Sequence, residues 1–155
     1  MRQHANMVTK AAFVQFNLSP LAIHSWADQY LERYRDCGRP APDSLQPHLL
    51  LCRAIELEFK AWHRQGTKQR PLKDAFRHDL IASYGALPAK HRILSTDEVD
   101  LLVRANEIYA KQKFERIGRP RAGDGFSARL NLAGLEALAK KLMERGNRMD
   151  LAQGT

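Results

Sequence analysis

Apolar and polar positions repeat with a helical period between Leu49 and Arg64, the most hydrophobic part of the chain. Two apolar rows run along this segment beside one narrow polar stripe. The rows are Leu50, Ala54, Leu57, Ala61 and Leu51, Ile55, Phe59, Trp62, and the stripe is Arg53, Glu56, Lys60 with His63 or Arg64. Because apolar residues cover more than half of the circumference, we expect a central helix over about 45–65 with neighbours on at least two sides.

One acidic residue does not fit this pattern. Glu58 lies on the same row as Leu51, Ile55 and Trp62, where an apolar residue is expected. Burial of a carboxylate requires a partner. We therefore expect Glu58 to be partly buried against an arginine or a tyrosine.

Other periodic segments predict helices on both sides of the central one. The first should begin with Ser19 as its N-cap and end near Cys37, before a Pro-rich connector. A third helical region is expected over about 71–87, either continuous or broken near 78–79. A fourth should start at Ser95, because Ser95 and Glu98 have the spacing of a capping box.

A strongly amphipathic segment near the C-terminus predicts a fifth helix that ends before Gly146. No strand pattern appears between residues 19 and 146. The sequence therefore predicts an all-α protein, with an up-and-down four-helix bundle over 19–118. An N-terminal arm (1–18) should precede the bundle. A linker and the amphipathic helix (119–155) should follow, and this helix either docks on the bundle or reaches to a second subunit.

Three segments of the chain resemble HEPN domains, which are small α-helical modules. The first two have the spacings A-x-E-x-x-x-K-A and L-K-x-x-F-x-H-D-L, and the third is L-S-T-D-E leading to an asparagine and a tyrosine. The residues are Ala54, Glu56, Lys60 and Ala61; Leu72, Lys73, Phe76, His78, Asp79 and Leu80; and 94–98 with Asn106 and Tyr109. The resemblance covers about residues 19–118. It implies a HEPN-like bundle that pairs as a homodimer and acts with a partner such as a nucleotidyltransferase.

Charge adds an expectation about partners. The chain of 155 residues has a formal net charge of +8. Residues 53–77 hold seven Lys or Arg against three acids and residues 104–121 hold six against two, so each segment carries +4. Such clustering favours an anionic partner, namely RNA, a nucleotide or DNA, although solvated basic faces are common.

Composition excludes several classes. The two cysteines, Cys37 and Cys52, are too few for a disulfide framework, and no apolar run is long enough for a membrane span or a signal peptide core. We therefore expect a cytoplasmic protein without membrane contact. The histidines show no metal-ligand spacing and no Gly-rich phosphate loop is present, so no metal or cofactor is expected.

Ribonucleases of the HEPN family carry an arginine followed by a histidine after four to six intervening residues. This chain has no such pair; the nearest, Arg70 and His78, has seven residues between its members. On the fourth helix, Tyr109 stands five residues after Arg104, where a histidine would be needed. A tyrosine is a poor proton shuttle at neutral pH. We therefore expect a catalytically degenerate binding module for RNA, a nucleotide or a protein partner.

Two alternatives stay open. One is an RNA endonuclease with a non-standard site around Arg104, Asn106 and Tyr109. The other is a basic DNA-binding protein that uses the segment 116–121 and the basic C-terminal helix. The candidate binding residues are Lys60, Arg77, His78, Arg104, Asn106, Tyr109 and Lys113. Within this set an ion pair between Glu56 and Lys60 is expected from their spacing. Asp79 is more typical of a helix cap than of an acid-base partner for His78.

Overall fold

Every regular element in the described part of the chain is helical. The computed structural model describes residues 19–38, 44–65, 76–110 and 131–151, and no strand occurs in these ranges. The predicted all-α class is therefore confirmed. No helix within the ranges is long and apolar enough to cross a membrane. The expected arm (1–18) and the linker up to residue 130 lie outside the described residues.

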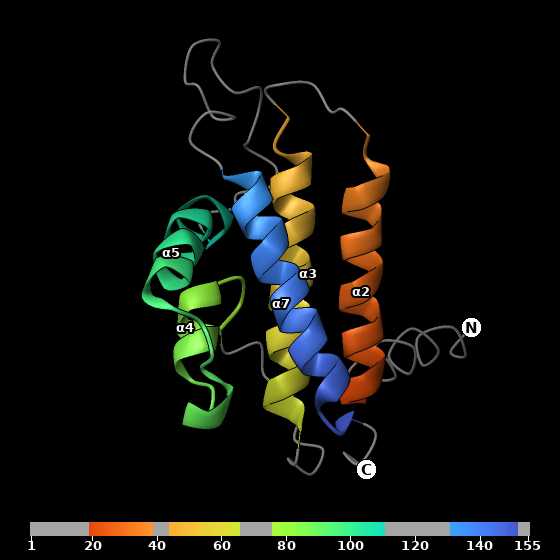
Figure 1. The fold of residues 1–155 in the computed structure, drawn as a ribbon, viewed down its shortest axis with the longest axis vertical. Coiled ribbons are helices and arrows are strands. Elements are labelled where there is room, and N and C mark those ends of the chain that lie inside the picture. The colour runs from red at the N-terminus through yellow and green to blue at the C-terminus, as the bar shows by residue number, and fades with distance from the viewer. Residues whose placement is uncertain (1–18, 39–43, 66–75, 111–130, 152–155) are drawn as a thin grey trace, which may run out of the picture.

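The first two helices form where the sequence predicts them. Helix α2 (Pro20–Asp36) starts with Ser19, whose hydroxyl accepts a hydrogen bond from the Ala22 amide at 3.1 Å. Helix α3 (Gln46–Arg64) runs antiparallel beside α2 at the centre of the molecule (Figure 1). Both apolar rows of α3 contribute to the core. Within the described residues α2, α4, α5 and α7 all pack on α3, so this helix is surrounded within one chain.

A short helix begins at Leu80. In the described part of the predicted third region, residues 76–79 are not helical, and helix α4 spans Leu80–Gly85. Asp79 Oδ1 accepts hydrogen bonds from the amides of Ile81 and Ala82 at 3.1 and 3.0 Å, so Asp79 is the N-cap that the sequence predicts. A short 3₁₀ turn, η1 (Ala89–His91), leads to the next helix. Within 76–87 the predicted third region is therefore helical only over Leu80–Gly85, and its earlier part, 71–75, lies outside the described residues.

Helix α5 (Thr96–Ala110) begins with the expected capping box. The Glu98 carboxylate accepts a hydrogen bond from the Ser95 amide at 2.7 Å, and the Ser95 hydroxyl accepts one from the Glu98 amide at 3.2 Å. Two amides at the helix start are thereby satisfied by side chains. The capping box of Ser95 and Glu98 therefore marks the beginning of the fourth predicted helix, as expected.

The C-terminal helix is longer than predicted. Helix α7 (Leu132–Arg148) passes through Gly146, so the expectation that it ends before this glycine is wrong. Gly146 is buried within the helix, where a side chain would collide with Glu58 and His24. The glycine permits close helix packing here and is not a stop signal. Helix α7 docks on α3, α2 and α5 of its own chain (Figure 1).

Candidate functional site

A buried carboxylate lies at the centre of the polar stripe of α3. The Glu56 side chain is 2% exposed, although it belongs to a row of polar residues. Four side chains contact it: two from α3 itself, one from the turn before α4 and one from α5. We call the group Arg53, Glu56, Lys60, His78 and Tyr109 the Glu56 cluster.

Each oxygen of the Glu56 carboxylate has two partners. Arg53 Nη1 and Lys60 Nζ donate to Oε1 at 3.0 and 2.6 Å. His78 Nδ1 lies 3.1 Å from Oε2, and the Tyr109 hydroxyl donates to the same oxygen. The His78 and Tyr109 rings meet edge to face with centroids 5.6 Å apart. The predicted ion pair between Glu56 and Lys60 is therefore present, within a larger network.

Burial and neighbouring charges decide the protonation of this cluster. Burial favours the neutral form of Glu56, but Arg53, Lys60 and the hydrogen bonds outweigh it and lower the pKa of the carboxyl. Burial and the nearby carboxylate raise the pKa of Tyr109. Burial alone would lower the pKa of Arg53, but Glu56 more than offsets this and the pKa is raised. At neutral pH the cluster therefore combines a carboxylate, two cations and a neutral phenol.

The outer part of the cluster is open to solvent. The side chains of Arg53, Lys60 and His78 are 28%, 26% and 38% exposed, whereas Tyr109 is fully buried. With His78 counted as neutral, two positive charges face one negative charge, so the cluster has a net charge of +1. The arrangement holds cationic donors in place around a buried anion and presents them at the surface.

The segment before α4 is held by α5. Asn106 Oδ1 accepts a hydrogen bond from the Leu80 amide at 2.8 Å, and Asn106 Nδ2 donates to Asp79 Oδ1 at 3.0 Å. Arg77 has a positive φ of 44°, which turns the chain just before His78. Asn106 therefore fixes the start of α4, and this in turn places His78 against Glu56.

The candidate residues predicted from the sequence do not form one group. Lys60, His78 and Tyr109 meet at Glu56, Arg77 and Asn106 lie beside them, and Lys113 is outside the described residues. Arg104 is exposed and lines a different surface. It is five residues from Tyr109, which places the two roughly 140° apart around α5. The prediction named neither Arg53 nor Glu56 as a site residue. Their spacing was a signal for both, because Arg53 is three residues before Glu56 and Lys60 is four residues after it, so all three share one face of the helix.

A second buried carboxylate joins α2, α3 and α7. Glu58 is fully buried and contacts His24 Nδ1 at 2.8 Å, and Trp62 Nε1 donates to it at 2.8 Å. His24 Nε2 lies 2.8 Å from Asn147 Oδ1 on α7. The expected arginine or tyrosine partner of Glu58 was therefore wrong, because α2 brings a histidine to this position. The Glu58 carboxylate raises the pKa of His24.

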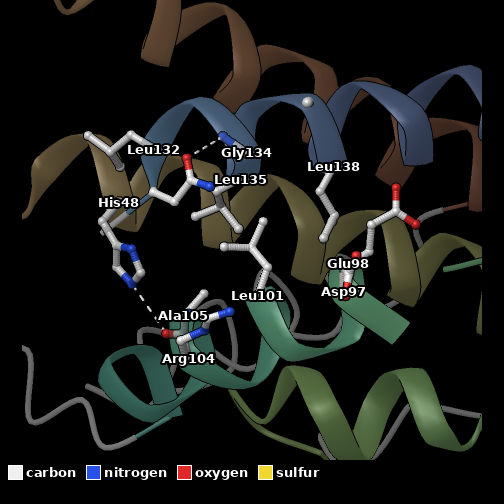
Figure 2. A pocket seen from close by; sticks show the side chains of 12 residues that line it. His48, Asp97, Glu98, Leu101, Arg104, Ala105, Leu132, Gly134, Leu135 and Leu138 are labelled. Carbon is white, nitrogen blue, oxygen red and sulfur yellow. Dashed lines mark hydrogen bonds between the residues drawn. The ribbon is translucent and has the colours of Figure 1, made fainter. Parts of the chain in front are cut away.

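A pocket of about 400 Å³ lies between α5 and α7 (Figure 2). Leucines from both helices form much of its wall: Leu101, Leu132, Leu135 and Leu138. Polar groups lie at its two ends. Figure 2 shows His48 and Arg104 near Ala105 at one end, and Asp97 with Glu98 at the other.

The described residues contain no cluster of His, Cys, Asp or Glu side chains that fits a metal ion. One histidine contacts each buried carboxylate, His78 at Glu56 and His24 at Glu58, and a metal site would need at least one more ligand of this kind. Comparison of the chain with protein-family models, with curated proteins and with solved structures found no match in any of the three.

Proposed function

We propose that the chain is a HEPN-like binding module without ribonuclease activity, and that the Glu56 cluster binds the phosphate groups of RNA or of a nucleotide. One observation carries the proposal. Arg53, Lys60 and His78 converge from two parts of the chain on one buried carboxylate and keep a partly exposed outer side.

Charge and geometry both support a phosphate ligand. Arginine and lysine are the usual phosphate donors in proteins, and arginine offers five N–H groups in a planar fork. Glu56 holds the two cations in fixed positions, so a ligand does not have to order them on binding. Both cations of the cluster, Arg53 and Lys60, also belong to 53–77, one of the two segments that carry the net charge of the chain. Electrostatic attraction would concentrate a polyanion near this surface.

The surroundings of Tyr109 and Asn106 support binding more than cleavage. The Tyr109 hydroxyl is buried against Glu56, and its raised pKa removes it from proton transfer near neutral pH. Asn106 uses its amide to hold the start of α4. Arg104 lies on another face of α5. An endonuclease site around Arg104, Asn106 and Tyr109 therefore has little geometric support.

The second candidate function is an RNA endonuclease centred on His78, and it has one supporting contact. His78 Nδ1 is 3.1 Å from the Glu56 carboxylate, as in pairs where a carboxylate orients a catalytic imidazole. Arg53 and Lys60 would then stabilise charge on the phosphate. Incubation of a single-stranded RNA with the native chain and with a His78→Gln variant separates the two functions. Cleavage lost in the variant supports the endonuclease, and intact RNA in both samples supports the binding module.

Partners beyond a nucleic acid rest on the resemblance. A nucleotidyltransferase-type protein and a second copy of the chain are proposed on that ground. The apolar surface of α3 gives no separate argument for a homodimer, because neighbouring helices of the same chain cover it. Light scattering that reports twice the chain mass would support the pair, and a monomer would exclude it. The DNA-binding alternative uses 116–121, which lies outside the described residues, together with the C-terminal helix α7.

A matched pair of lysines tests the phosphate site. Lys60 and Lys140 each form an i, i+4 ion pair with a glutamate, at 2.6 and 2.9 Å. We would measure the affinity for a fluorescein-labelled single-stranded RNA by anisotropy at several salt concentrations. Lys60→Gln should weaken binding and reduce the salt slope by about 0.7 for one lost phosphate contact. Lys140→Gln removes the same charge elsewhere and should leave the slope unchanged. Equal effects of the two variants would contradict the site.

A further inference from the structure

The pocket between α5 and α7 contains a buried polar atom without a partner. His48 lines this pocket and is fully buried. Its Nε2 lies 3.2 Å from the Ala105 carbonyl oxygen and 3.5 Å from Cys52 Sγ, and its Nδ1 has no hydrogen-bond partner among the described residues. An unpaired polar atom in an interior costs free energy, so such an atom in a pocket wall suggests a missing ligand group.

The chemistry of that group follows from the tautomer of His48. A carbonyl oxygen only accepts hydrogen bonds, so Nε2 carries the hydrogen that points to Ala105. Burial lowers the pKa of His48, which keeps the ring neutral at neutral pH. In a neutral imidazole the other nitrogen is an acceptor. His48 Nδ1 therefore needs a hydrogen-bond donor, such as a hydroxyl group.

Arg104 sets the charge that this end of the pocket favours. Its guanidinium lies at the same end as His48 (Figure 2), and its Nε donates to the Asp100 carbonyl at 3.3 Å. The opposite end is acidic. Asp97 lies there beside Glu98, whose carboxylate is held by Lys141 at 2.7 Å. An anionic group would be attracted to Arg104 and repelled by Asp97, so the pocket fixes the direction in which an anion enters.

We propose that this pocket binds a small carboxylic acid with an apolar body and a hydroxyl group. The carboxylate pairs with Arg104, the hydroxyl donates to His48 Nδ1, and the apolar body lies against Leu101, Leu135 and Leu138. A volume of about 400 Å³ is within the range of small-molecule sites in proteins. The site is separate from the Glu56 cluster, because Arg104 and Tyr109 lie on different faces of α5.

The test uses meta-hydroxybenzoate as the probe and amide chemical shifts of the ¹⁵N-labelled full chain as the readout. Saturable shifts should appear in 97–105 and 132–138. Meta-methoxybenzoate has the same carboxylate but no hydroxyl donor, and it should bind about five- to tenfold more weakly. Arg104→Gln should weaken the binding of meta-hydroxybenzoate by a similar factor. Absence of saturable shifts, or equal affinity for the two acids, would overturn the proposal.

Two alanines on α7 supply a matched control. Both are exposed, but Ala137 lines the pocket and Ala133 does not. Ala137→Trp should fill the pocket and abolish binding of meta-hydroxybenzoate, whereas Ala133→Trp should bind like the native chain. Circular dichroism would verify that both variants are folded. Unchanged binding to Ala137→Trp, or equal loss in both variants, would show that the acid does not bind between α5 and α7. RNA should not displace the probe, so this result does not depend on the proposed phosphate site.

Discussion

Replacement of Gly146 by alanine should destabilise the protein, against the usual effect of this substitution in a helix. Gly146 lies on α7 where the helix packs on the buried pair of Glu58 and His24. An added Cβ would overlap Glu58 Oε1 and lie 2.8 Å from His24 Nδ1. Neither group can move easily, because both are buried and hydrogen-bonded to each other.

The magnitude follows from two opposing contributions. Alanine is favoured over glycine inside a helix by about 1 kcal/mol. Relief of the overlap requires either that α7 move away or that the pair of Glu58 and His24 separate. Loss of the partner of a buried charge costs about 3–5 kcal/mol. The free energy of unfolding should therefore fall by roughly 2–4 kcal/mol in Gly146→Ala.

Urea unfolding of matched variants measures this effect. Gly85 at the end of α4 is the control, because nothing lies within 4 Å of a Cβ added there. Gly85→Ala should be neutral or raise the stability by up to about 1 kcal/mol. In a Glu58→Ala background the cost of Gly146→Ala should shrink, since the overlapping carboxylate is gone. A Gly146→Ala variant as stable as Gly85→Ala would refute the close packing of α7 on Glu58.

Three further predictions concern polar side chains that form hydrogen bonds within the fold. Tyr109→Phe removes one donor from the Glu56 carboxylate and should lower the free energy of unfolding by about 1.5–3 kcal/mol in urea titrations; no loss would show that the hydroxyl is not a partner. Asp79→Ala removes the N-cap of α4 and should cost about 1 kcal/mol in the same assay, whereas Asp79→Asn should restore most of it. The Glu58 carboxylate raises the pKa of His24 in the folded chain. The native chain should therefore have a higher free energy of unfolding than a His24→Gln variant. This difference should be largest below about pH 6.5 and should decline as pH rises through the higher folded pKa. A difference that does not change with pH would contradict this.

Local sequence signals predicted the described helices well. Ser19, the pair of Ser95 and Glu98, and Asp79 each start a helix through a side chain within three residues of the amide it binds. Such contacts depend on short spacing and are visible without knowledge of the fold. The period of the central helix likewise predicted that it would be covered on several sides, as α3 is.

Contacts between distant residues were beyond the same reasoning. Glu58 is paired with His24, which is 34 residues away, and His24 also contacts Asn147 across 123 residues. The role of Gly146 depends on Glu58 and His24, which are distant in sequence. A glycine after an amphipathic segment therefore suggested a helix end, where the structure has close packing.

The candidate site was predicted only in part for a similar reason. The spacing within α3 predicted that Glu56 pairs with Lys60, but it could not show that His78 from the turn before α4 and Tyr109 from α5 share the same partner. The sequence grouped Arg104 with Tyr109 because their spacing matches that of the arginine and histidine in HEPN ribonucleases. Five residues of α5 place them on different faces, and the packing of α5 decides which face meets α3.

The most direct test of the phosphate site is the location of RNA contacts on the folded chain. Amide chemical shifts of the ¹⁵N-labelled protein would be followed during titration with a short single-stranded RNA, at low and at moderate salt. The Glu56 cluster predicts saturable shifts concentrated in 53–60 and 76–80, and their loss in Lys60→Gln but not in Lys140→Gln. Saturable shifts confined to other surfaces, or no shifts at any RNA concentration, would contradict a phosphate site at the Glu56 cluster.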